Sequence, residues 1–168
     1  NGRLELSSNP GVAITTFTKA DLVANLVRYV HNGGETTADS FTFTINDEYF
    51  SFTGNTFNLA VTPINDAPLG TDKTITTLED TNYVFTASDF GFTDPNDAVP
   101  NTLLGVQVVT IPGAGNLFLA AGASVTGAVT AGQFISAADL AFLTFAPVAN
   151  ANGTGYANFT FRVRDNGG

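Results

Sequence analysis

Hydrophobic and polar residues alternate along several short stretches of this chain. In segment 41–45, threonines separate Phe41, Phe43 and Ile45, and the large apolar residues of segments 57–61 and 159–163 have the same spacing. A period of two is expected of a strand that has one face against a core and the other in water. The pattern therefore predicts a protein built from short β-strands.

Parts of the chain repeat when the sequence is compared with itself. A shift of 118 places aligns "FTKADL" with "ISAADL" and "SFTFTIND" with "NFTFRVRD", and a shift of 113 aligns "GRLEL" with "GNLFL". A fixed period of this kind indicates a tandem array. We therefore expect residues 1–66 to be the C-terminal half of one repeat, and residues 67–168 to be a second repeat that lacks its last strand.

Turn residues and apolar runs place the strands of the second repeat. The expected strands are 72–78, 82–88, 103–111, 115–120, 142–147 and 158–164, and the final strand of the first repeat is expected at 55–63. Helix-forming residues follow Thr18 and Ser136, which are suitable N-caps, so each repeat should contain a short helical turn. Short strands separated by turn signals favour a sandwich of two sheets.

Composition narrows the classes of function. The net charge of −9 repels nucleic acid and anionic membranes, and the absence of cysteine excludes disulfides, thiol catalysis and thiolate zinc sites. No apolar run approaches the roughly 20 residues of a membrane span. Because there is no initiator methionine, we expect the sequence to be an excerpt of a longer protein.

Several ordered motifs resemble a known family. The segments "FTKADLVANLVRYVHNGGETTADSFTFTIND", "FNLAVTPINDAP", "LEDTNYVFTASDFGFTD" and "GQFISAADLAFLTFAP" are similar to cadherin-like repeats of the chondroitin-sulphate-proteoglycan (NG2) type. Such repeats occur in proteoglycan ectodomains and in giant bacterial surface adhesins. The resemblance implies an all-β fold of tandem immunoglobulin/cadherin-like Greek-key β-sandwiches. It also implies an extracellular or cell-surface location, and the composition favours a bacterial one, with biofilm adhesion among the implied roles.

Strand directions bring several acidic loops to one place. If neighbouring strands run antiparallel, the loop after the second strand, the loop after the sixth strand and the linker before the first strand all meet at the joint between repeats. The candidate ligands there are Asn65, Asp66, Asp94, Asn96, Asp97 and Asp165, together with Asp39 from the preceding repeat. Gathered carboxylates repel one another unless a cation binds, and calcium accepts six to eight oxygen ligands in irregular geometry. The pattern therefore predicts a Ca²⁺ site, and "NDAP" resembles the calcium linker of cadherins. Turn formation is the competing explanation for Asp94, Asp66 and Asp165.

Other polar residues do not form a catalytic pattern. His31 is the only histidine and has no serine or aspartate at motif spacing, so it is expected to end a strand and to bond locally. Asp21 and Asp139 occupy equivalent positions beside the helical turns, which favours capping over a glycosidase pair. We therefore expect no enzymatic activity.

The resulting hypothesis is a structural or adhesive spacer of a long extracellular repeat protein, stiffened by calcium at the joint. Its partners would be neighbouring repeats of the same chain, with a cell-surface or glycan receptor bound through other domains. A carbohydrate- or protein-binding module is one alternative, with Tyr49, Phe50 and Phe52 as the contact if they face solvent. A filament whose subunits exchange strands is another, because the second repeat lacks a strand.

Overall fold

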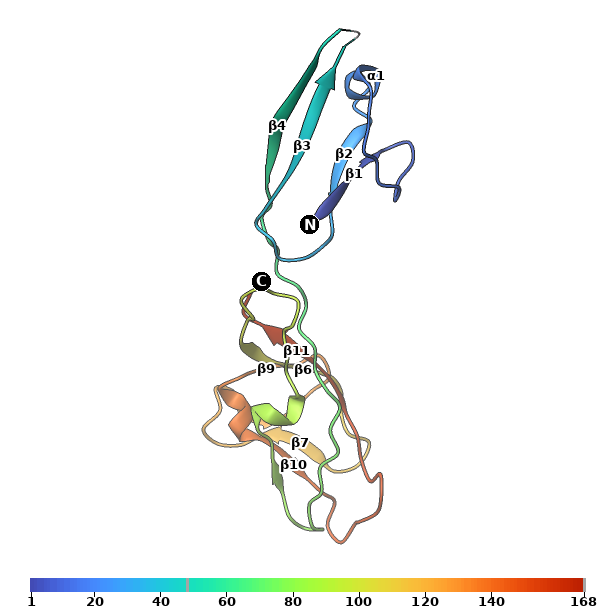
Figure 1. Ribbon diagram of the computed structural model, residues 1–168. Coiled ribbons are helices and arrows are strands. Elements are labelled where there is room, and N and C mark those ends of the chain that lie inside the picture. The colour runs from blue at the N-terminus through green and yellow to red at the C-terminus, as the bar shows by residue number, and fades with distance from the viewer. Residues whose placement is uncertain (48, 168) are drawn as a thin grey trace. The chain divides into compact units, whose positions relative to one another are not determined.

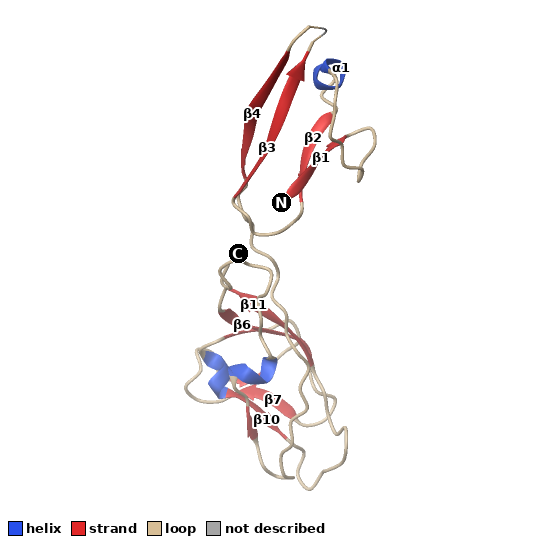
Figure 2. Cartoon of the chain, viewed as in Figure 1, coloured by secondary structure: helices blue, strands red, loops and turns tan. Residues whose placement is uncertain are grey.

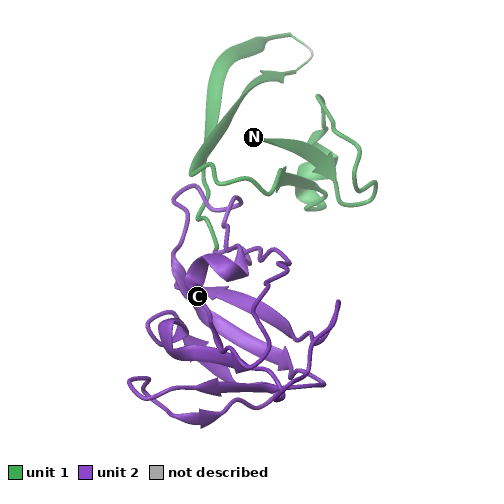
Figure 3. Cartoon of the chain, turned by 90° about the horizontal axis from the view of Figure 1, so that it is seen from below, with its two compact units in different colours: residues 1–64 green, residues 65–168 purple. Residues whose placement is uncertain are grey.

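Antiparallel strand pairing organises both parts of the chain. The computed structural model describes residues 1–47 and 49–167, which form two units, Asn1–Ile64 and Asn65–Gly168 (Figure 3). Helix is confined to short turns (Figure 2). The all-β fold predicted from the alternating pattern is confirmed.

The first unit contains two separate pairs of strands. Strand β1 (Gly2–Leu6) pairs with β2 (Val27–His31), and β3 (Ala38–Asn46) pairs with β4 (Ser51–Ala60), both antiparallel (Figure 1). Among the described residues of this unit, none of the hydrophobic side chains is fully buried. This unit therefore lacks the closed core that a complete sandwich would have.

The helical turn of the first unit has the cap that the sequence predicts. Helix α1 (Lys19–Val23) begins after Thr18, whose hydroxyl accepts a hydrogen bond from the Asp21 backbone. The Asp21 carboxylate in turn accepts from the Thr18 backbone amide at 2.8 Å. This reciprocal capping satisfies two amide groups that a helix leaves unpaired at its start, so the predicted capping role of Asp21 is confirmed.

The second unit is a sandwich of two sheets. Its elements are β5 (Tyr83–Val84), the 3₁₀ turn η1 (Ala87–Phe90), β6 (Leu103–Thr110), β7 (Asn116–Leu119), β8 (Gly127–Ala128), β9 (Phe134–Ser136), the 3₁₀ turn η2 (Asp139–Phe142), β10 (Leu143–Ala146) and β11 (Thr160–Asp165). One sheet has the order β5-β10-β7-β8 and the other β11-β6-β9. The inward residues of both sheets form a single core, whose buried members are Phe85, Phe90, Val106, Val108, Leu117, Leu119, Val129, Ile135, Leu140, Leu143 and Val163.

The internal repeat is also a repeat of strand pairing. In β1 and β2, Leu4 lies opposite Tyr29, and in β7 and β10, Leu117 lies opposite Phe145. The 113-place shift carries Leu4 onto Leu117, so the equivalent strands β1 and β7 each pair with a strand that follows a helical turn. The turn before β10 is likewise related to α1, because the Ser136 hydroxyl accepts from the Asp139 backbone amide.

The structure differs from the predicted strands at the start of the second unit. Segment 72–78 is not a strand, and the predicted strand 82–88 shrinks to β5. A strand requires a partner for its ladder. The one described backbone bond of segment 72–78 is a local turn, in which the Thr81 amide donates to the Leu78 carbonyl. The second strand ends early because the Asp89 side chain accepts from the Thr86 backbone amide, which turns the chain into η1.

The last strand of the first unit begins earlier than predicted. Strand β4 covers 51–60 rather than 55–63, because Asp47 closes a tight turn that places Ser51 opposite Asn46. The division between the units falls after Ile64, two residues before the predicted boundary. Asn65 and Asp66 bond to loops of the second unit and so belong to it structurally.

Candidate metal centre

Carboxylate and amide side chains gather at one end of the second unit. They come from the segment that enters the unit, from the loop between η1 and β6, and from the end of β11. The residues joined there by hydrogen bonds are Asn65, Asp66, Asp94, Asp97, Asn101 and Asp165. We call this set the acidic cluster.

The entering segment is tied to both other parts of the cluster. Asn65 donates from its side-chain amide to an oxygen of Asp165 at 3.3 Å. The backbone amide of Asp66 donates to Asp97 at 3.3 Å, and one carboxylate oxygen of each of these residues lies within 4.8 Å of one of the other's. The carboxylates of Asp66 and Asp97 are thus held close together. Among the described residues, no lysine or arginine donates to the hydrogen bonds that join the cluster.

Asn101 holds the centre of the cluster, and the sequence reasoning missed it. Its side-chain amide donates to Asn65 and to Asp97, the latter at 3.0 Å, while its backbone amide donates to Asp94 at 2.8 Å. Its position at the end of the loop that contains Asp94 and Asp97 is the signal that could have found it. Asn101 therefore positions three of the other members.

Asp94 has a buried carboxylate oxygen without a partner. The residue is only 5% exposed, and its Oδ2 accepts from Asn101. Within the described part of the chain, its Oδ1 is the one buried side-chain oxygen or nitrogen that has no hydrogen bond. A buried, unpaired oxygen of a carboxylate is unfavourable by about 1–3 kcal/mol or more, so such an oxygen in a native protein usually has a partner, such as a donor group, an ordered water or an ion.

The donor chemistry of the cluster fits a hard cation. Every available ligand atom is an oxygen of a carboxylate, a side-chain amide or the backbone, and neither histidine nor cysteine is present. Such oxygens suit Ca²⁺, whereas zinc favours nitrogen and sulfur. The Oδ1 of Asp94 adds a buried carboxylate oxygen that has no hydrogen-bond donor among the described residues.

The predicted residue Asn96 lies apart from this hydrogen-bonded set. Its side chain is exposed, and no hydrogen bond from it is among those of the described residues. Asp165, by contrast, is buried at the end of β11 and accepts from the Gly167 backbone amide at 2.9 Å as well as from Asn65. Both residues remain predicted ligands, and the structure places Asp165, but not Asn96, in the cluster.

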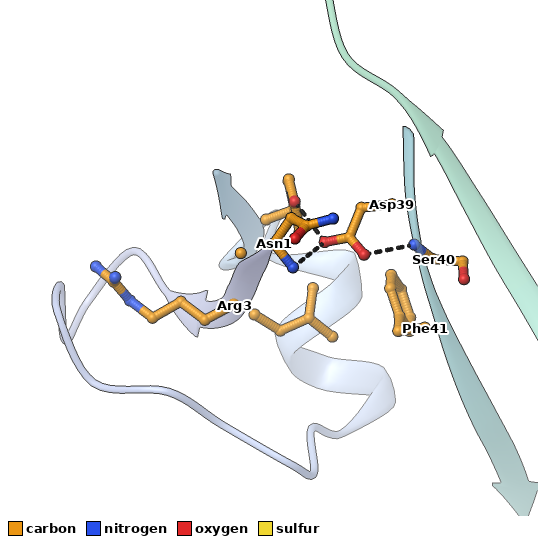
Figure 4. A pocket seen from close by; sticks show the side chains of 8 residues that line it. Asn1, Arg3, Asp39, Ser40 and Phe41 are labelled. Atoms are coloured by element: carbon orange, nitrogen blue, oxygen red, sulfur yellow. Dashed lines mark hydrogen bonds and ion pairs between the residues drawn. The ribbon is translucent and has the colours of Figure 1, made fainter. Parts of the chain in front are cut away.

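Asp39 lies in the first unit and has partners of its own. Its carboxylate accepts from the Tyr29 hydroxyl at 2.7 Å and from the Ser40 amide, and it lies 3.1 Å from the amino group of Asn1 (Figure 4). The Tyr29 bond, followed by the amino group, lowers the pKa of Asp39 to about 2. Burial and then the Asp39 bond raise the pKa of Tyr29 to about 12. These contacts give Asp39 a structural role, and its role as a metal ligand stays a prediction.

The aromatic residues of the β3–β4 turn face solvent. Tyr49 is 81% exposed, and Phe50 and Phe52 are each 67% exposed. Exposure of these rings is the observation that favours a binding module over a plain spacer. The turn is therefore a second candidate site, of a different chemical kind.

The remaining polar candidates are used locally. His31 ends β2, and its Nε2 lies 2.8 Å from the Thr36 hydroxyl. Asp139 accepts from Ser124 and Ser136, which hold its pKa below the ordinary value. These contacts are structural, as the sequence indicated for both residues. Over the described residues, no helix has the length and apolar character needed to cross a membrane.

Comparison with known proteins finds a family model that matches the first part of this all-β chain. The family model described as Cadherin-like matches residues 1–61. The narrower proteoglycan-type resemblance stays a prediction.

The similar proteins are named as components of the extracellular matrix. Extracellular matrix organizing protein FRAS1 of Homo sapiens is 39% identical over 67 residues, which are 39% of this chain and 2% of that protein. Extracellular matrix protein 3 of Lytechinus variegatus is 32% identical over 118 residues, which are 69% of this chain and 4% of that protein. FRAS1-related extracellular matrix protein 2 of Homo sapiens is 30% identical with the same coverage. The chain thus spans 2 to 4% of the length of these relatives. No solved structure matches it significantly.

Proposed function

We propose that this chain is a structural or adhesive segment of a large extracellular repeat protein, stiffened by calcium at the acidic cluster. The cadherin-like match and the matrix proteins among its relatives support the extracellular role. The names of those relatives describe matrix proteins and no enzyme. The bacterial origin expected from composition stays a prediction, since the matched relatives are animal proteins.

The unpaired Oδ1 of Asp94 is the observation that carries the calcium proposal. The carboxylates of a merely acidic surface face bulk solvent, whereas this oxygen is buried and has no donor from the described residues. A bound cation would compensate for the missing donor. Asp94, Asp97 and Asp165, with Asn65 and Asp66, are the residues that would hold the ion.

Calcium at this position would restrict the segment that joins the repeats. Asn65 and Asp66 directly follow the first unit, and they carry few apolar atoms with which to pack against a neighbour. Without an ion, a short polar linker permits relative motion of domains. Ligation of the linker residues would reduce that motion, which is the property a spacer needs.

Calorimetric titration of the whole chain with calcium tests the proposal. We expect binding to the unaltered protein and to Asp72→Asn, because Asp72 is exposed and outside the cluster. Asp94→Asn should weaken binding at least about tenfold, which corresponds to about 1.4 kcal/mol. Equal binding by all three proteins would place calcium elsewhere and remove the basis of the proposal.

Small-angle scattering then tests the stiffening itself. The distribution of maximum dimensions should narrow when calcium is added and widen again with chelator. If calcium binds but leaves the distribution unchanged, Pro63 and Pro68 would account for the geometry of the linker, and the ion would serve only to stabilise the fold.

Exposure of the aromatic turn favours a second candidate function, the binding of a carbohydrate or a protein. Planar rings present large contact area to sugars and proteins at low entropic cost. Replacement of both Tyr49 and Phe50 by alanine should abolish binding to any glycan that the unaltered chain retains on an array. If the unaltered chain retains none, and if coupling it to a column captures no cell-surface protein, the binding-module alternative fails.

A further inference from the structure

Asparagine directly precedes glycine at four places in the chain. The pairs begin at Asn1, Asn32, Asn152 and Asn166. The first pair enters strand β1, and the other three lie in loops. The backbone amide that follows an asparagine can attack the side-chain carbonyl carbon, and glycine hinders this attack least because it has no Cβ. The three loops are alike in sequence, so their hydrogen bonds decide whether they react alike.

The reaction at such a pair forms one bond and breaks another. The glycine nitrogen loses its proton and bonds to the asparagine Cγ, while negative charge collects on Oδ1. The bond from Cγ to Nδ2 then breaks, and the amino group takes up a proton and leaves as ammonia, which closes a succinimide ring. Water opens the ring at either carbonyl to give aspartate or isoaspartate. An unpaired glycine amide, an exposed side chain and a donor to Oδ1 therefore favour the reaction.

Asn32 has all three properties. Asn32, Gly33 and Gly34 are exposed, and no hydrogen bond from the Gly33 amide is among those of the described residues. The Asn32 Oδ1 accepts from the Gly34 amide at 3.1 Å, so a donor within the reacting loop already meets the oxygen that becomes charged. The position of a Cβ on Gly33 has open space around it. The loop can therefore bend toward the reacting geometry without a clash.

Asn166 is held at both of the groups that would react. Its Oδ1 accepts from the Thr102 backbone amide at 2.8 Å, which ties the side chain to the segment that leads into β6. The Gly167 amide, which would attack, donates to Asp165 at 2.9 Å. The amide must give up its bond before it attacks, and the side chain must leave Thr102 to follow it. The fold therefore protects this asparagine.

Asn152 is an intermediate case. Its side-chain amide donates to Glu79 at 2.7 Å, while no bond from the Gly153 amide is among those of the described residues. The negative charge of Glu79 opposes a second negative charge on the Asn152 side chain. Asn152 should therefore react more slowly than Asn32.

We propose that Asn32 is a site of spontaneous deamidation, at which the loop between β2 and β3 acquires a carboxylate as the protein ages. This loop connects the two strand pairs of the first unit, and the 2.8 Å contact between His31 Nε2 and the Thr36 hydroxyl spans it. Aspartate keeps an acceptor for the Gly34 amide. Isoaspartate instead lengthens the backbone of the loop by a methylene group, so the modification changes both the charge and the length of the connection.

Peptide mapping by mass spectrometry tests the proposal on the whole chain, incubated at mildly alkaline pH and sampled over time. Product at Asn32 should form about 30-fold faster than at Asn166, which corresponds to about 2 kcal/mol for the two bonds that protect Asn166. In guanidinium chloride the rate at Asn166 should rise to a value similar to that at Asn32, whose own rate should change little.

Two variants serve as controls. Asn32→Gln should remove the early product, because glutamine closes the corresponding larger ring much more slowly. Glu79→Gln should speed the reaction at Asn152 and leave that at Asn32 unchanged. Equal rates at Asn32 and Asn166 in the folded chain, or a rate at Asn32 that rises on unfolding as much as that at Asn166, would overturn the proposal.

Discussion

Replacing Asp94 by asparagine separates a metal ligand from a residue that only shapes a loop. The substitution keeps the size of the side chain and an acceptor oxygen for the Asn101 amide. It removes the negative charge and replaces the unpaired Oδ1 by a group that does not bind calcium. The two explanations then predict different responses to calcium.

The burial of Asp94 sets the expected magnitudes. Without calcium, a neutral amide is easier to bury than an unpaired carboxylate, so the variant should be more stable than the unaltered chain by about 1 kcal/mol. With calcium at about 100 times its dissociation constant, the unaltered chain gains about 2.7 kcal/mol. For a unit of roughly 100 residues, whose unfolding entropy is about 0.21 kcal/mol/K, that gain raises the melting temperature by about 13 °C.

Thermal unfolding followed by the methyl resonances of Val106 and Val108 reports on the second unit alone, because both side chains are in its core. The order of the two melting temperatures should reverse. Asp94→Asn should melt at a higher temperature than the unaltered chain in chelator and at a lower temperature in calcium. Asp72→Asn should keep the full calcium response. Equal calcium shifts in the Asp94 variant and the unaltered chain would refute the argument from the unpaired oxygen.

Three further changes test the fold and its electrostatics. Leu143→Ala should destabilise the second unit by about 2–5 kcal/mol in urea unfolding, because Leu143 is fully buried, and it should leave the unfolding of the first unit unchanged. Burial raises the pKa of Asp89, but its bonds to Lys73 and Thr86 outweigh that effect and hold the pKa below the ordinary value. The contribution of Asp89 to stability is therefore present above about pH 4 and is lost as the pH falls through the lowered value. Lys73→Gln should raise the pH at the midpoint of acid unfolding, and an unchanged midpoint would contradict this. Thr18→Ala should destabilise only the first unit, by about 1 kcal/mol, because the cap of α1 is lost. Thr18→Ser keeps the capping hydroxyl and should keep the stability of the unaltered chain.

The sequence alone was enough to predict the strands and turns whose signals are local. Alternation identified β3 and β11, and the threonine cap identified α1, because a strand face and a helix start depend on neighbouring residues. Strand direction also placed Asp94, Asp97 and Asp165 at one end of the unit, since antiparallel neighbours alternate in direction whatever their side chains.

Only the tertiary structure decided which backbone and side-chain groups have partners. Segment 72–78 has the composition of a strand yet forms none, because a ladder depends on a neighbour that its own sequence does not specify. The position of Asn101 in its loop did not specify its partners, and its role arises because Asn65, which is distant in sequence, meets its side-chain amide. Likewise, the burial of one Asp94 oxygen without a partner depends on how the loop folds over it. Charge and periodicity are properties of the chain, but desolvation and hydrogen bonding are properties of the packed unit.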